Sequence, residues 1–128
     1  MATRNINDAA PVLRAAYLAA VTQWQQVHPA FPQPFLTCVY RSPQEQDMLY
    51  ARGRTAQGSR VTNARGGQSK HNSHPSRAID IAFRTSGGSV NWEITYFREF
   101  ARIIQSIDST IRWGGNFRSI KDNPHFEI

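Results

Sequence analysis

A short apolar segment that contains an acid limits what this chain can fold into. Residues 77–83 read RAIDIAF, with Ile79, Ile81 and Phe83 alternating with Ala78, Asp80 and Ala82. Successive side chains of a β-strand point to opposite faces, so the three large residues should face a core. Asp80 would then lie between two alanines on the other face. Because burying a carboxylate is costly unless a cation, hydrogen bonds or a metal compensates it, the segment predicts a strand that carries a polar site.

The end of the sequence repeats this arrangement. In the segment PHFEI, Phe126 should face the core, while His125 and Glu127 share the opposite face, and Asp122 comes three residues before His125. The Ser/Asn/Pro-rich segment before the first strand adds two more histidines, His71 and His74.

Together these residues suggest a metal site. Two imidazoles and one carboxylate form a common three-ligand zinc shell, which leaves a fourth position for water. A carboxylate outside the shell can then move protons, and Asp122 or Glu127 is suited to that role. The alternative for Asp80 is a salt bridge, for which Arg77 is the nearest cation in the sequence.

Apolar periodicity predicts about three helices. They should cover residues 8–27, 43–51 with Ser42 as N-cap, and 91–107. Short strands are expected at residues 35–40, 77–83, 110–113 and 124–128. This mixture indicates an α+β fold, and 128 residues favour one domain over residues 1–128.

Charge and cysteine content narrow the class of protein. The net charge is +6, and residues 51–70 form a loop with five cations, four glycines and no acid. Such a balance favours a polyanionic partner, which includes nucleic acid, an anionic envelope or acidic peptides. The single cysteine, Cys38, rules out an internal disulfide and fits a reducing compartment. We find no signal peptide and no membrane-spanning run, so we expect synthesis in the cytoplasm.

Four segments taken together resemble the zinc-dependent peptidoglycan peptidases of the D,D-carboxypeptidase/L-alanyl-D-glutamate peptidase superfamily, most closely the small phage endolysins. The segments are YRSPQEQDMLYARGRT (residues 40–55), VTNARGGQSKHN (61–72), PSRAIDIAF (75–83) and WGGNFRSIKDNPHFEI (113–128). The resemblance implies a small antiparallel sheet with about three helices and one zinc ion in a cleft on the sheet.

The resemblance also implies a role for individual residues. His71, Asp80 and His125 would be the zinc ligands, Asp122 the general base that also passes a proton to the leaving amine, and Arg41 the group that stabilises the developing oxyanion. Ser69 and Gln46 would support the substrate or the metal ligands.

The spacing departs from that of many relatives, which have fewer residues and a glycine between the first two ligands. Here Asp80 follows His71 by nine residues and His74 by six, without a glycine, so His74 stays an alternative ligand.

The implied activity is hydrolysis of the L-alanyl-D-glutamate bond of peptidoglycan stem peptides by a monomeric enzyme, with D-Ala-D-Ala carboxypeptidase activity as the alternative. A phage lysis enzyme would reach the cell wall after release by a holin. Two other classes stay open from the charge and the site: a basic nucleic-acid-binding protein or nuclease, and an inactive wall-recognition domain. The resemblance favours peptidoglycan as partner, with no nucleic acid and no membrane insertion.

Overall fold

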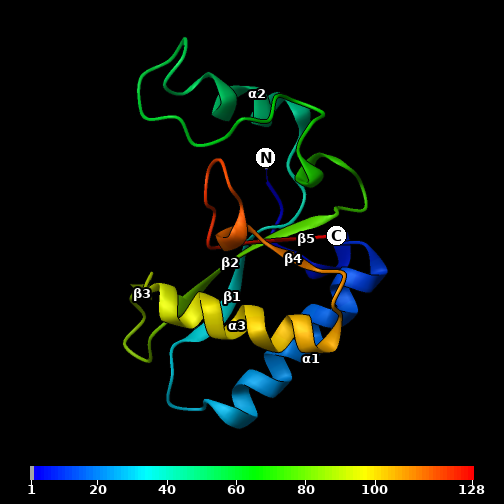
Figure 1. Ribbon diagram of the computed structural model, residues 1–128, viewed down its shortest axis with the longest axis vertical. Coiled ribbons are helices and arrows are strands. Elements are labelled where there is room, and N and C mark those ends of the chain that lie inside the picture. Colours follow the sequence, from blue (N-terminus) through cyan, green and yellow to red (C-terminus); the bar gives the residue numbers. More distant parts are fainter. Residues whose placement is uncertain (1) are drawn as a thin grey trace.

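The computed structural model describes residues 2–128 and has an α+β architecture (Figure 1), which confirms the expected fold class. The helices are α1 (Pro11–Val27), α2 (Pro43–Ala51) and α3 (Ile94–Ile107). The strands are β1 (Gln33–Cys38), β2 (Ala78–Arg84), β3 (Val90–Asn91), β4 (Arg112–Trp113) and β5 (His125–Glu127). Three 3-10 turns, η1 (Ile6–Asp8), η2 (Lys70–Asn72) and η3 (Gly114–Asn116), connect them.

The sheet is antiparallel, as expected, and has β2 at its centre. The strand order is β1-β2-β5-β4, and β3 pairs with the far end of β2. The register places Asp80 of β2 opposite His125 of β5 on one side and opposite Cys38 of β1 on the other. A register shift between Leu36 and Cys38 precedes this second pairing. The polar residue of β2 therefore lies between two potential metal ligands from its neighbours.

Helices α1 and α3 pack together against one face of the sheet (Figure 1). Ile79, Ile81 and Phe83 of β2 are fully buried in this core, together with Trp24 of α1 and Phe100 of α3. The alternation in the sequence therefore identified the core face correctly. Ala78 and Ala82 on the other face are also fully buried, so that face is covered as well.

Helix α2 and the basic loop after it lie on the opposite side of the sheet from α1 and α3 (Figure 1). Ser42 begins α2 as expected, because its hydroxyl accepts a hydrogen bond from the Glu45 amide at 3.2 Å. The loop contains no long helix or strand. The Arg54 guanidinium links the end of α2 to the middle of the loop, because it donates to the carbonyl oxygens of Tyr50 and Thr62 at 2.7 and 3.1 Å. The Asp47 carboxylate of α2 holds the later part of the loop by accepting a hydrogen bond from the Gly66 amide at 2.7 Å.

Two helix starts differ from the sequence-based expectation. α1 begins at Pro11 because residues 6–8 form η1 and proline suits the first helical turn. α3 begins at Ile94 because residues 90–91 pair with Phe83 and Arg84 as β3. No helix within residues 2–128 is long and apolar enough to cross a bilayer.

Candidate metal centre

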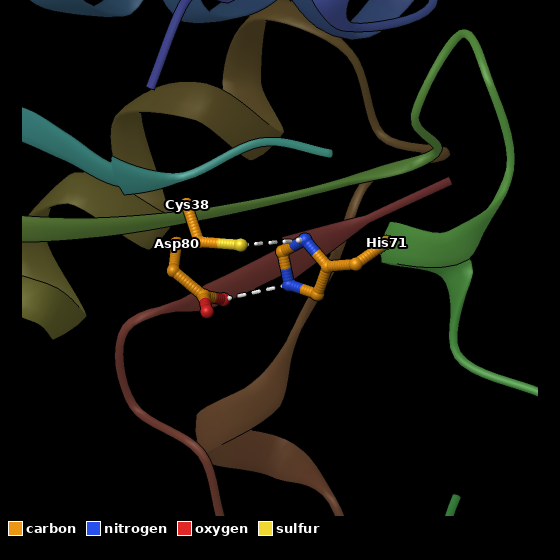
Figure 2. A group of neighbouring side chains, drawn as sticks. All are labelled: Cys38, His71 and Asp80. Carbon is orange, nitrogen blue, oxygen red and sulfur yellow. Dashed lines mark hydrogen bonds and ion pairs between the residues drawn. The ribbon is translucent and has the colours of Figure 1, made fainter. Parts of the chain in front are cut away.

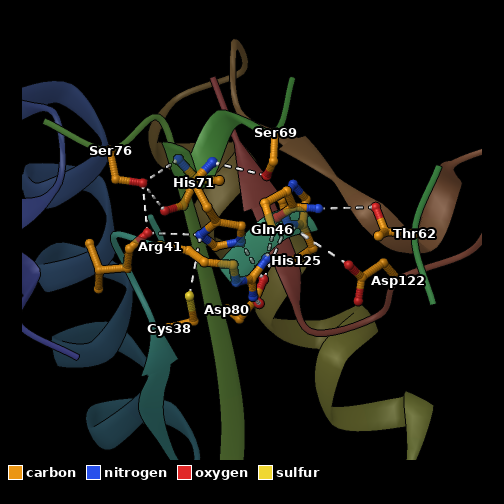
Figure 3. Close-up of polar contacts among 12 residues, drawn as sticks. Cys38, Arg41, Gln46, Thr62, Ser69, His71, Ser76, Asp80, Asp122 and His125 are labelled. Atoms are coloured by element: carbon orange, nitrogen blue, oxygen red, sulfur yellow. Dashed lines mark hydrogen bonds and ion pairs between the residues drawn. The ribbon is translucent and has the colours of Figure 1, made fainter. Parts of the chain in front are cut away.

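Three side chains from separate elements converge above the sheet (Figure 3). His71 comes from η2, Asp80 from β2 and His125 from β5. His71 Nε2 and His125 Nδ1 each lie 3.1 Å from the same oxygen, Asp80 Oδ1. The two imidazole centroids are 5.1 Å apart, and both histidines are buried. The structure therefore places both histidines in contact with the same carboxylate oxygen of Asp80.

The other nitrogen of each imidazole is held by the protein. His71 Nδ1 lies 2.8 Å from the Val39 carbonyl oxygen, which can only accept, so Nδ1 carries the proton. His125 Nε2 lies 2.8 Å from Glu127 Oε1 and donates to it. In the neutral tautomers, lone pairs of both imidazoles therefore point at a carboxylate oxygen. Each of these two contacts between acceptors, at 3.1 Å, needs a proton or a metal ion between the atoms.

The pKa shifts of the three side chains also indicate that the site favours positive charge. Burial alone would lower the pKa of His71, but the Asp80 carboxylate outweighs it and raises that pKa to about 10. Burial likewise opposes the charge on His125, whose pKa the Asp80 and Glu127 carboxylates raise to about 9. The pKa of Asp80 falls well below its usual range, because the two imidazoles outweigh the effect of its burial.

Cys38 is a neighbour that the sequence did not identify as a candidate ligand. Its thiol lies 3.6 Å from His71 Nδ1, while Asp80 contacts the other nitrogen of the same ring (Figure 2). Cys38, His71 and Asp80 are close enough together to hold a metal, and so are Asp80, Asp122 and His125, so Asp80 is shared by two clusters that contain one histidine each. Since His71 Nδ1 already donates to Val39, the nitrogen next to the thiol is the less available one. The register shift in β1, which the sequence does not reveal, brings Cys38 to this position.

The arginine beside Asp80 is Arg41, and not Arg77, which was the nearest cation in the sequence. Its Nη2 lies 3.6 Å from Asp80 Oδ2, and its Nη1 donates to Gln46 Oε1 at 3.0 Å. Gln46 is almost fully buried, and its amide nitrogen donates to the Ala64 carbonyl oxygen at 2.9 Å. Gln46 therefore ties Arg41 to the basic loop, and its amide is occupied by the protein.

Asp122 stands at the mouth of the site on a tight turn. Its Oδ2 lies 3.9 Å from His125 Nδ1, and its side chain is 48% exposed. The Asp122 amide donates to the Gly114 carbonyl oxygen at 3.0 Å, and the His125 amide donates to the Asp122 carbonyl oxygen at 3.0 Å. A Cβ at Gly114 would press directly on that Asp122 carbonyl, so the close approach requires glycine. Burial and the nearby Asp80 carboxylate raise the pKa of Asp122, which strengthens it as a base.

Glu127 is less accessible than Asp122. It is buried, and both of its oxygens contact basic groups: Oε1 faces His125, and Oε2 lies 3.1 Å from Lys70 Nζ. Both carboxylates that the sequence offered as proton carriers line the cleft, and Asp122 is the more exposed of the two.

The other candidate residues, Ser69 and His74, contact neighbouring residues and not Asp80. Ser69 caps η2, where its hydroxyl accepts from the His71 amide at 3.2 Å. His74 is 64% exposed and lies 3.7 Å from Asp8, with its ring against Tyr40, and it does not join the group around Asp80. The fourth histidine, His28, lies away from this group, and its Nε2 makes a hydrogen bond with Glu99 Oε2 at 2.7 Å.

A cleft of about 620 Å³ lies above these residues. Its walls include the α2–loop side (Leu49, Arg52, Val61), the η2 segment with Ser69, and the segment between η3 and β5 (Phe117, Ile120). His71, Asp80, Asp122, His125 and Arg41 all line it. The arrangement can therefore present a polar substrate to a cation site, a carboxylate and an arginine at once.

Comparison with known proteins places the chain among peptidases. The family model described as D-alanyl-D-alanine carboxypeptidase matches residues 62–128, the segment that contains His71, Asp80, Asp122 and His125. The peptidoglycan L-alanyl-D-glutamate endopeptidase CwlK of Bacillus subtilis (strain 168) is 39% identical over 98 residues, which cover 70% of this chain and 56% of CwlK. The chain thus spans little more than half the length of that curated relative.

The fold has a solved counterpart. The crystal structure of Serratia marcescens L-Ala D-Glu endopeptidase ChiX superposes with a TM-score of 0.70 at 22% identity, covering 97% of this chain and 83% of that one. This likeness supports the fold. The family match spans more than half of the chain and includes His71, Asp80 and His125. The chain therefore belongs to the D-alanyl-D-alanine carboxypeptidase family of peptidases.

Proposed function

We propose that this chain hydrolyses the L-alanyl-D-glutamate bond of peptidoglycan stem peptides, with one zinc ion held by His71, Asp80 and His125. The observation that carries the proposal is the convergence of His71 Nε2 and His125 Nδ1 on Asp80 Oδ1, each at 3.1 Å, on the wall of an open cleft. Two nitrogens and a carboxylate are a donor set that suits zinc and leaves a position for water or substrate. The choice of bond follows the activity that the name of CwlK gives.

The chain's own residues supply the rest of the chemistry. Zinc, when bound, supplies Lewis acidity, which acidifies water and polarises a carbonyl group. Asp122, open to the cleft and with a raised pKa, takes a proton from the attacking water and returns it to the leaving amine. Arg41, oriented by Gln46, offers N–H donors to the oxygen on which negative charge develops. Arginine suits this place because its guanidinium stays charged at any working pH.

The deciding experiment is mass spectrometry of purified peptidoglycan after digestion, with and without a chelator. We expect new L-Ala carboxyl ends and D-Glu amino ends, lost with chelator and restored by zinc. Products from an Asp122→Ala variant at the wild-type rate would show that the base is assigned wrongly. Absence of products from the zinc-loaded protein would refute the peptidase proposal and favour a wall-recognition domain or a nucleic-acid partner.

A second candidate activity is D-Ala-D-Ala carboxypeptidase, which the description of the matching family itself names. The same digestion distinguishes the two, since this activity releases free D-Ala and leaves the L-Ala–D-Glu bond intact.

The basic loop is proposed to hold the acidic stem peptide or the anionic wall. Arg52 lines the cleft and has no acidic partner within residues 2–128, whereas Arg54 is used to close the loop. Charge reversal of Arg52 and Arg60 should therefore weaken binding to insoluble peptidoglycan in a sedimentation assay. Reversal of Arg54 should instead loosen the loop itself. Unchanged binding by the Arg52 and Arg60 variants would contradict this role.

A phage-type lysis role, with monomeric enzyme released by a holin, is proposed from the resemblance of the sequence to small endolysins. Expression in a bacterial host, with and without a co-expressed holin, tests it. Lysis should require the holin, and lysis without one would argue against this route.

A further inference from the structure

Glu127 is a buried carboxylate that the proposed chemistry leaves without a task. Only 8% of the residue is exposed. Its Oε1 accepts from His125 Nε2 at 2.8 Å, while Oε2 lies 3.1 Å from Lys70 Nζ and 3.5 Å from Arg112 Nη1. Lys70 Nζ also donates to the Ile128 carbonyl oxygen at 2.6 Å. Burial of this carboxylate costs desolvation free energy, which these specific partners offset.

The contacts join the two segments that carry the histidines. Lys70 directly precedes His71 in η2, and Glu127 follows His125 by two residues on the same face of β5. The Lys70–Glu127–His125 chain of contacts therefore connects η2 to β5. In the sheet, Glu127 pairs with Ala78 of β2 on one side and with Arg112 of β4 on the other.

We propose that Glu127 is a positioning residue for the metal site: it holds His125 in the Nε2–H tautomer with Nδ1 directed at the metal, and Lys70 holds Glu127 in place. A metal-bound histidine commonly donates its other N–H to a carboxylate, which fixes the ring and raises its basicity as a ligand. The inference rests on the metal site of the proposed function and is independent of which peptide bond is cut.

The test is the zinc affinity of the purified protein, measured by competition with a chromogenic chelator. Glu127→Ala should bind zinc about 10–100-fold more weakly than wild type. Glu127→Gln should lose less, because its amide oxygen can still accept from Nε2–H. Lys70→Met should fall between wild type and Glu127→Ala. Arg112→Ala is the matched control, since Arg112 contacts the same carboxylate from an exposed position and should stay within about twofold of wild type.

A spectroscopic measurement separates positioning from general stability. In the zinc-loaded wild type, ¹⁵N NMR should show His125 as a single Nε2–H tautomer, and Glu127→Ala should lose that uniformity while Arg112→Ala keeps it. Zinc affinity of Glu127→Ala within twofold of wild type, with His125 unchanged, would overturn the proposal. If Glu127→Ala does not fold, Glu127→Gln and Lys70→Met decide: two wild-type affinities overturn it, and graded losses support it.

The outcome is separable from that of the proposed function. A wild-type protein that binds zinc but cleaves no peptidoglycan would refute the peptidase proposal, and the affinities would still decide the role of Glu127. A wild-type protein that binds no zinc would overturn both.

Discussion

Zinc binding to the metal-free protein should release about two protons at pH 7.5. The perturbation is the addition of zinc to chelator-treated protein. Each proton that occupies a ligand nitrogen must leave before the metal binds, so the count reports the protonation of His71 and His125 in the metal-free state.

The magnitude follows from the crowding of both imidazoles against Asp80. Against the effect of burial, the Asp80 carboxylate raises the pKa of His71 to about 10 and helps to raise that of His125 to about 9, so both rings are mostly protonated at pH 7.5 and zinc displaces about two protons. Histidines with an ordinary pKa of about 6.5 would be only about one-tenth protonated and would release about 0.2 protons together. Ionisation of a zinc-bound water with a pKa of about 7 adds at most about one proton in either case.

The assay is isothermal titration calorimetry in several buffers of different ionisation enthalpy at the same pH. The slope of the observed enthalpy against the buffer ionisation enthalpy gives the number of protons released. We expect a value between about two and three.

A His125→Ala variant provides the control, because removing one ring should lower the count by about one. A wild-type value of about one or less would refute the reasoning. It would mean that the metal-free imidazoles are neutral and that Asp80 does not hold protons on them.

Three further changes test separate parts of the site. Asp122→Asn should lower kcat about 10²–10⁴-fold while zinc affinity stays within a few-fold, and activity above half of wild type would remove Asp122 as the base. Cys38→Ser should leave zinc affinity unchanged if His71 binds through Nε2, whereas a loss of tenfold or more by chelator competition would make the thiol a ligand. Gly114→Ala should lower the free energy of unfolding by about 1–3 kcal/mol in a denaturant titration. It should also reduce kcat/KM, because the new Cβ would press on the Asp122 carbonyl oxygen. A variant as stable and as active as wild type would contradict the need for glycine.

The sequence by itself determined the faces of the strands and most of the elements. Alternation at Ile79, Ile81 and Phe83 assigned the buried face of β2 correctly, since a strand has a side-chain period of two and a core excludes polar groups. The same rule put His125 on the face opposite Phe126, and the structure directs His125 toward Asp80. Helix boundaries shifted by up to three residues where local turns competed, as at η1 and β3.

Only the tertiary structure decided which side chains share the site. His71 and His74 are three residues apart in one polar segment, and nothing in their spacing says which faces Asp80. The fold of η2 turns His71 inward against the Val39 carbonyl and leaves His74 on the surface beside Asp8. Likewise Arg41 replaced Arg77 as the cation beside Asp80, and a register shift in β1 brought Cys38 next to His71. Periodicity fixes the face of a residue within its own element, whereas contacts between elements depend on register and loop path, which no local pattern encodes.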